Sequence, residues 1–108
     1  MRKLLATLCL LLFIAPAQGV MAQNDSQKAV LITGASSGIG RNMAETLARE
    51  GYYVYAGARK QADIDALSAM DNVEGIRLDV TAQEEIDAAV EHVRSEGRGL
   101  YGLVNNAG

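Results

Sequence analysis

The sequence has 108 residues and a formal net charge of -3, with 49% hydrophobic and 21% charged residues, which is typical of one small globular domain or part of a larger one. The negative charge and the pI of about 5.0 exclude the basic surface that nucleic-acid-binding proteins use. A single cysteine, Cys9, excludes a disulfide within the chain, and a single histidine, His92, argues against a metal site.

The N-terminal residues 1–22 have the layout of a secretory signal peptide. Two basic residues precede an apolar run over residues 4–14, and Val20 and Ala22 place short side chains ahead of a cleavage point. Residues 4–22 just reach the ~20 residues that a membrane-spanning helix needs. An uncleaved anchor is therefore the second interpretation, and a cytoplasmic extension is the third. The layout favours export to a periplasm, a secretory lumen or the medium, with residues 23–108 as the mature part.

From residue 28 onward, short apolar runs alternate with helical patterns. The apolar runs predict four strands, over residues 29–33, 52–56, 73–78 and 100–104. Apolar residues at helical spacing predict three helices, over residues 39–50, 63–70 and 81–96. This alternation predicts an α/β fold, a Rossmann-type parallel sheet with right-handed crossovers. The pattern stops after the fourth strand, so we expect the N-terminal part of a longer domain.

The buried faces and the ends of the helices can also be predicted. The first helix is expected to bury Ile39, Met43 and Leu47 and to end before Gly51. A capping box over Thr81–Glu84 is expected to start the third helix. The apolar stripe of that third helix is expected at Ile86, Ala89, Val90 and Val93.

A glycine-rich turn over residues 33–40 joins the first strand to the first helix. Gly34 lets the backbone turn sharply, Gly38 lets it approach a pyrophosphate, and Gly40 allows close packing of helix on strand. Ser36 and Ser37 add hydroxyl donors beside the free N–H groups of the helix N-terminus. A glycine-rich turn alone can be a plain loop, but the strand before it and the helix after it favour a phosphate-binding site.

Three motifs follow predicted strands in a fixed order: Thr-Gly-x-x-x-Gly-x-Gly over residues 33–40, then Asp79-Val80, then Asn-Asn-Ala-Gly over residues 105–108. With these motifs, residues 28–108 resemble the short-chain dehydrogenase/reductase family. The resemblance implies that the turn holds the pyrophosphate and the adjoining ribose. It also implies that the Asp79 carboxylate accepts from the adenine amino group and that Val80 packs near that ring.

The same resemblance implies that Asn105 is a structural asparagine and that Ala107 and Gly108 leave room for the cofactor. From the residues alone, Asp79 is also a favourable acid at the N-terminal end of the helix over 81–96. The expected cofactor contacts are Gly34, Ser36, Ser37, Gly38, Ile39, Gly40, Arg59, Lys60, Asp79, Val80, Asn105, Ala107 and Gly108.

The end of the second strand indicates which dinucleotide is bound. The position that carries an acid in NAD-preferring relatives corresponds to Ala58, and Arg59 and Lys60 follow it directly. Without a carboxylate there, two cations are available to pair with a 2′-phosphate. The alternative is that both are solvated loop charges. NADP is therefore favoured, with NAD as the alternative.

The resemblance implies reversible hydride transfer between a nicotinamide and the carbonyl or alcohol carbon of a small, lipophilic substrate, by a full-length protein that forms homo-oligomers. The family's catalytic serine, tyrosine and lysine lie further along its sequence, so no catalytic residue is assigned and this portion alone is expected to be inactive. The alternatives are a non-catalytic dinucleotide-sensing module and a defective fragment. We interpret His92 as a surface residue, and as strand residues we interpret Tyr52, Tyr53, Tyr55 and Tyr101.

Overall fold

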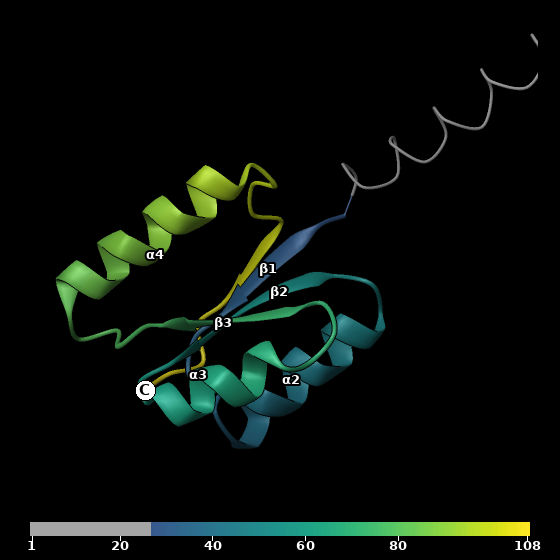
Figure 1. Cartoon of the computed structure of the whole chain (residues 1–108), viewed down its shortest axis with the longest axis horizontal. Helices are drawn as coiled ribbons and strands as arrows, with labels where there is room; N and C mark the ends of the chain where they lie inside the picture. The colour runs from purple at the N-terminus through teal and green to yellow at the C-terminus, as the bar shows by residue number, and fades with distance from the viewer. Residues whose placement is uncertain (1–26) are drawn as a thin grey trace, which may run out of the picture.

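The computed structural model describes residues 27–108 (Figure 1). These residues form four strands and three helices in alternation: β1 (Ala29–Ile32), α2 (Gly38–Arg49), β2 (Tyr53–Ala58), α3 (Gln61–Ser68), β3 (Val73–Arg77), α4 (Gln83–Glu96) and β4 (Gly102–Val104). The predicted signal peptide or anchor lies outside the described residues. Among the helices that are described, none is both long enough and apolar enough to span a membrane.

The four strands form one parallel sheet in the order β3-β2-β1-β4. The predicted α/β fold with a Rossmann-type sheet is therefore confirmed. From β1 the chain adds β2 and then β3 on one side of β1, and it then crosses back to place β4 on the other side of β1. In sheets of this type, ligands bind outside the carboxyl ends of the strands at such a switch point.

Helices cover the sheet on both faces, α2 and α3 on one and α4 on the other (Figure 1). The core under α2 and α3 contains Ile32, Val54 and Ala56 from the strands, with Ala44 and Leu67 from the helices. Because successive strand residues point to opposite faces, alternate positions such as Tyr53 and Tyr55 turn toward α4 instead. Tyr55 is fully buried there and meets the ring of His92 edge-on, at 6.0 Å between ring centroids.

The first helix buries a different face from the one predicted. Its buried residues are Gly40, Ala44 and Ala48, whereas Ile39 is 72% exposed. Small side chains let the helix lie close to the sheet, which moves the larger residues to the flank of the contact. Met43 and Leu47 are partly buried there, so two of the three predicted positions pack against the core. The predicted end of this helix is confirmed, since it stops at Arg49, two residues before Gly51.

The predicted capping box at the start of α4 is wrong. The N-cap residue is Ala82, and no side chain caps the helix. The hydroxyl of Thr81 donates instead to Asp79 Oδ1 at 2.6 Å. The residue that reaches back is Glu85, whose Oε1 accepts from the backbone N–H of Asp79 at 2.9 Å. The stripe of α4 also differs from the prediction, because Ala89 is buried while Val90 is 51% exposed.

Candidate cofactor-binding site

The carboxyl ends of β1 and β4 are joined through one threonine hydroxyl. Thr33 Oγ1 accepts from the backbone N–H groups of Asn106 at 2.9 Å and Ala107 at 3.0 Å, and it donates to Asn105 Oδ1 at 3.2 Å. Thr33 is 5% exposed, so these bonds are shielded from water. The glycine-rich turn and the Asn-Asn-Ala-Gly run, about seventy residues apart in sequence, are thereby held as one unit.

Two glycines let this unit close. Gly34 has a φ of +64°, and a Cβ on it would come within 3.0 Å of Ala107 Cα. A Cβ on Gly40 would lie 2.2 Å from the carbonyl oxygen of Gly34 and 2.7 Å from the side-chain amide nitrogen of Asn106. That amide donates to the Gly34 carbonyl at 3.0 Å. A side chain at either glycine would therefore force the turn apart from the end of β4.

The N-terminus of α2 is left free for an anion. Its N-cap, Ser37, makes no capping bond through its side chain, and the first turn carries no acidic residue. Gly38 follows with a φ of +58°, and the space that its Cβ would occupy is open. By contrast, α3 has Asp63 and α4 has Glu84 in the first turn. The first N–H groups of α2 and its positive dipole end thus suit a phosphate group.

A cavity of about 450 Å³ opens beside this turn and continues to the end of β3. Asp79 lies on its far side, and Thr81 donates its hydroxyl and its backbone N–H to Asp79 Oδ1. These bonds, with the charge of Arg59, hold the pKa of Asp79 below its usual value against a small opposing effect of desolvation. The carboxylate is therefore ionised at neutral pH, and its second oxygen can accept from a ligand.

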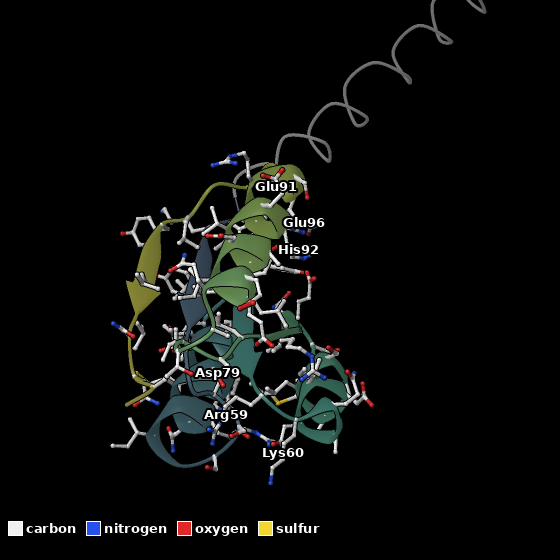
Figure 2. The ribbon with its side chains drawn as sticks, turned by 90° about the vertical axis from the view of Figure 1, so that its left-hand side faces the viewer. Arg59, Lys60, Asp79, Glu91, His92 and Glu96 are labelled. Atoms are coloured by element: carbon white, nitrogen blue, oxygen red, sulfur yellow. The ribbon has the colours of Figure 1, made fainter. Side chains whose placement is uncertain are left out.

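A smaller hollow of about 240 Å³ lies next to this cavity and is lined by both serines of the turn and by Arg59, Lys60 and Asp63. Figure 2 shows Arg59 and Lys60 on the same side of the molecule as Asp79. The two cations are thus brought to the turn, as predicted. No carboxylate stands at position 58, as the sequence shows, but Asp63 from the first turn of α3 reaches the same hollow.

Arg77, at the end of β3, supports the backbone of this region. Its guanidinium donates to the carbonyl oxygen of Arg59 at 2.6 Å and to Gln61 Oε1 at 3.0 Å. The bond to the carbonyl fixes the chain at Arg59 without using the guanidinium of Arg59 itself. Arg77 therefore adds a third positive charge close to Arg59.

The structure brings most of the predicted contacts to one cavity and separates a few. Lining the larger cavity are Gly34, Ser36, Ser37, Arg59, Asp79, Val80, Ala107 and Gly108. Lys60 lines the smaller hollow, and the first turn of α2 contains Gly38, Ile39 and Gly40. Asn105 faces a groove on the α4 side instead, and Asn106 takes its place in the larger cavity.

The roles of four residues are visible only in the structure: Thr33, Asn106, Asp63 and Arg77. Thr33 and Asn106 belong to the motifs described above, but the local sequence does not indicate which asparagine donates its amide to Gly34. Asp63 and Arg77 come near Arg59 only through the packing of α3 and β3. No feature of the sequence near these two residues indicates that proximity.

Comparison with known proteins agrees with this geometry. A family model described as short chain dehydrogenase matches residues 28–108, three quarters of the chain. The chain belongs to the short-chain dehydrogenase family. In this short-chain dehydrogenase, the matched region begins one residue before β1 and includes every element of the sheet.

Similar proteins include oxidoreductases from bacteria and mammals. The chain is 43% identical over 83 residues to the uncharacterized oxidoreductase YbbO of Escherichia coli K12, covering 76% of this chain and 30% of that protein. It is 42% identical over 91 residues to the mitochondrial D-beta-hydroxybutyrate dehydrogenase of Bos taurus, covering 75% and 26% respectively. This short-chain dehydrogenase thus spans about a third of the length of the curated relatives that it matches.

A solved structure shows the same fold. The crystal structure of a short-chain dehydrogenase from Streptomyces avermitilis superposes with a TM-score of 0.70 at 44% sequence identity, covering 77% of this chain and 31% of that one. Members of the family use NAD(P) in general. The residues present fit such a cofactor, because the free helix N-terminus and the open space at Gly38 suit its phosphates.

Proposed function

We propose that this chain is the cofactor-binding portion of an NADP-dependent dehydrogenase/reductase that interconverts an alcohol and a carbonyl compound. The observation that carries the proposal is one continuous site. It joins the uncapped N-terminus of α2, the ionised carboxylate of Asp79 and the cations Arg59 and Lys60. Each of the three suits a different part of a dinucleotide phosphate.

Each part of the site has a distinct task. The N–H groups of the first turn of α2 bind the pyrophosphate, and Gly38 keeps the approach open. Asp79 accepts from the adenine amino group, while Val80 covers the ring. Thr33 and Asn106 hold the glycine-rich turn and the end of β4 at a fixed distance from each other. When bound, the nicotinamide supplies or accepts a hydride, and this chain orients the cofactor for that transfer.

The preference for NADP rests on the end of β2. The last residue of β2, Ala58, offers no carboxylate to the ribose 2′-OH. Arg59 and Lys60 offer positive charge at the hollow beside it, and the guanidinium of Arg59 can pair with a phosphate in bidentate fashion. Asp63 reduces this preference, because its charge repels a 2′-phosphate.

A binding experiment on the full-length protein tests this preference. We expect Arg59→Ala to weaken NADP binding about 10- to 100-fold, the value of one or two charged hydrogen bonds, and to leave NAD binding nearly unchanged. Titration calorimetry with both dinucleotides measures this. Arg49→Ala is the matched control, since Arg49 is an exposed arginine at the opposite end of α2. Equal affinity of the unmodified protein for NAD and NADP would refute the preference.

We further propose a small, lipophilic alcohol or carbonyl substrate and a full-length protein that assembles into homo-oligomers. Turnover of NADPH with a panel of such carbonyl compounds tests the reaction. Tight NADP binding with no turnover of any of them would favour the non-catalytic sensing module instead.

We also propose export through the N-terminal segment. Cell fractionation with N-terminal sequencing tests this, and cleavage after Ala22 is the expected result. An intact N-terminus in the membrane fraction would favour the anchor, and an intact N-terminus in the cytoplasmic fraction would contradict export.

A further inference from the structure

A second group of polar side chains lies at the opposite end of the sheet from the cofactor-binding site. It contains Glu74 at the start of β3, and His92 and Glu96 near the end of α4. One ligand atom from each of these three residues lies within 4.8 Å of the others. Figure 2 shows His92 and Glu96 close together on α4, far from Asp79 and Arg59. His92 and Glu96 are one helical turn apart, so both side chains extend from the same helix face.

The carboxylate of Glu74 is already oriented by its neighbours. The hydroxyl of Tyr53 donates to Glu74 Oε1 at 2.8 Å, while Glu74 Oε2 contacts His92 Nε2 at 2.5 Å. Burial and the hydrogen bond to Glu74 raise the pKa of Tyr53 to about 12, so its hydroxyl remains a donor. One oxygen of Glu74 is thus held from behind while the other faces the histidine, an arrangement typical of the outer shell of metal ligands.

Glu96 is held in a similar way. Arg98 Nη1 lies 3.1 Å from Glu96 Oε1, and the guanidinium of Arg98 stacks 3.7 Å over the ring of Tyr53. The second oxygen of Glu96 is free to turn toward His92. The side chains of Glu74, His92 and Glu96 are 27–38% exposed, so ions in solution can reach them.

A buried hydroxyl next to the group has no hydrogen-bond partner among residues 27–108. Tyr55 is completely buried, and its hydroxyl makes no hydrogen bond with any part of the chain that the structure describes. In the register of the sheet, Tyr55 lies directly opposite Glu74 on the neighbouring strand. The ring of Tyr55 meets the ring of His92 edge-on, at 6.0 Å between ring centroids, which places Tyr55 against the group. Burial raises the pKa of Tyr55, and the nearby guanidinium of Arg98 opposes that rise. A buried polar group without a partner indicates a missing ligand or water.

We propose that Glu74, His92 and Glu96 bind a divalent transition-metal ion such as Zn²⁺, with a water molecule as its fourth ligand and hydrogen-bonded to the hydroxyl of Tyr55. Imidazole nitrogen and carboxylate oxygens are ligands that zinc accepts, in a four-coordinate site. To admit an ion at ordinary metal–ligand distances of about 2 Å, His92 Nε2 and Glu74 Oε2 need to move apart by about 1 Å. The prediction from sequence of no metal site rested on a histidine without partners, and the fold supplies two.

The proposed ion has a structural role. It lies at the edge of the sheet where β3 begins, whereas the cofactor-binding site lies at the edge where β3 ends (Figure 2). Its ligands come from two elements, so it would hold α4 onto β3. Such a clamp matters for α4, because Ala89 is the one residue of this helix that is buried. Binding of the ion therefore stabilises the folded chain without entering the dinucleotide chemistry.

Metal titration of the untagged, full-length protein tests the proposal. With Zn²⁺ alone as the probe, we expect saturable binding in the micromolar range by calorimetry and a higher thermal unfolding midpoint. Bound Co²⁺ is expected to show the intense visible bands of four-coordination. His92→Gln and Glu96→Gln should each weaken Zn²⁺ binding by more than about 100-fold, since even outer-shell changes cost 10- to 100-fold. Tyr55→Phe should weaken it about 10-fold for the same reason.

Glu91→Gln is the matched control, because Glu91 is also a glutamate on α4 but pairs with Arg94 and is not one of the three proposed ligands. It should bind Zn²⁺ like the unmodified protein. Circular dichroism verifies that each variant is folded. The absence of saturable binding to the unmodified protein, or equal binding by His92→Gln, would overturn the proposal. Neither result bears on NADP binding, so this proposal and the proposed function can fail separately.

Discussion

At the scale of single residues, Thr33 makes three side-chain hydrogen bonds that join the two segments of the cofactor-binding site. Its hydroxyl oxygen accepts from the backbone N–H groups of Asn106 and Ala107, and its hydrogen goes to Asn105. The N–H of Asn106 also donates to the carbonyl oxygen of Val104 at 3.2 Å, whereas the N–H of Ala107 has Thr33 Oγ1 as its one acceptor among the described residues. A buried donor that loses its acceptor costs far more than an average hydrogen bond contributes. One hydroxyl therefore fixes the distance between the turn and the end of β4.

Replacing Thr33 by valine keeps the shape of the side chain and removes the hydroxyl. We expect Thr33→Val to lower the free energy of unfolding by about 2 kcal/mol, because the N–H of Ala107 loses its acceptor at a cost of ~1–3 kcal/mol while the N–H of Asn106 keeps its longer bond to Val104. NADP binding should weaken as well, since the run over residues 105–108 is released. Urea unfolding of the full-length protein measures the first effect. Thr33→Ser is the control: it keeps the oxygen and should cost about 1 kcal/mol for the lost methyl group. Equal losses for the two variants would contradict this account.

The residue scale also limits what the sequence can predict. The motifs predict which segments meet at the site, because the carboxyl ends of parallel strands share one edge of the sheet. They do not predict that Asn105 bonds to Thr33 while Asn106 donates its side-chain amide to Gly34, since that depends on how the chain bends after β4. The partner of His92 is likewise unpredictable, because Glu74 lies eighteen residues away and meets it only when α4 packs on the sheet.

At the scale of whole elements, the order, type and number of strands and helices in residues 28–108 were predictable. Periodicity reports burial, and the strands of a parallel sheet are buried on both faces. The contact face of α2 was not predictable in this way. Hydrophobicity singled out Ile39, yet close packing selected the small residues Gly40, Ala44 and Ala48. The capping box predicted from the local sequence at α4 is also wrong, because Thr81 bonds to Asp79 and does not cap the helix.

The start of α2 illustrates a conflict between helix stability and binding. Ser37 occupies the N-cap in an extended conformation without capping through its side chain, and no acid stabilises the first turn. A stability-optimised helix would carry Asp or Asn at the cap and an acid just inside. Leaving these N–H groups free reserves them for a phosphate. Helix α2 is thus less stable than it would be with a capping residue and an acid at its N-terminus.

Two substitutions at Ser37 separate capping from charge. We expect Ser37→Asp and Ser37→Asn each to raise the free energy of unfolding by about 0.5–1 kcal/mol, because both side chains cap well. Ser37→Asp should also weaken NADP binding about tenfold or more, since its charge opposes the pyrophosphate at short range. Ser37→Asn should weaken it much less. Thermal unfolding and NADP titration of both variants measure these effects. Unchanged NADP affinity in Ser37→Asp would mean that phosphate does not bind at this helix end.

At the scale of the whole molecule, the two faces of the sheet are covered unequally. Within residues 27–108, two helices cover one face, while α4 alone covers the other (Figure 1). Between α4 and β4 lies an apolar groove of about 750 Å³, and its lining includes Leu31, Val90 and Leu103. Val90 is 51% and Leu103 is 59% exposed. Contiguous apolar surface of this kind differs from an isolated exposed side chain, because it offers a continuous area to an apolar ligand.

This difference can be measured with a dye that fluoresces on apolar surfaces, such as anilinonaphthalene sulfonate. We expect the 108-residue chain to bind it, and the double variant Val90→Ser/Leu103→Ser to lose most of the fluorescence, because both changes interrupt the groove. Ile39→Ser is the matched control: at 72% exposure Ile39 is more accessible than either residue, yet it does not line the groove. That variant should keep the fluorescence of the unmodified chain. If all three serine substitutions reduced it in proportion to exposed area, scattered apolar residues rather than the groove would be binding the dye.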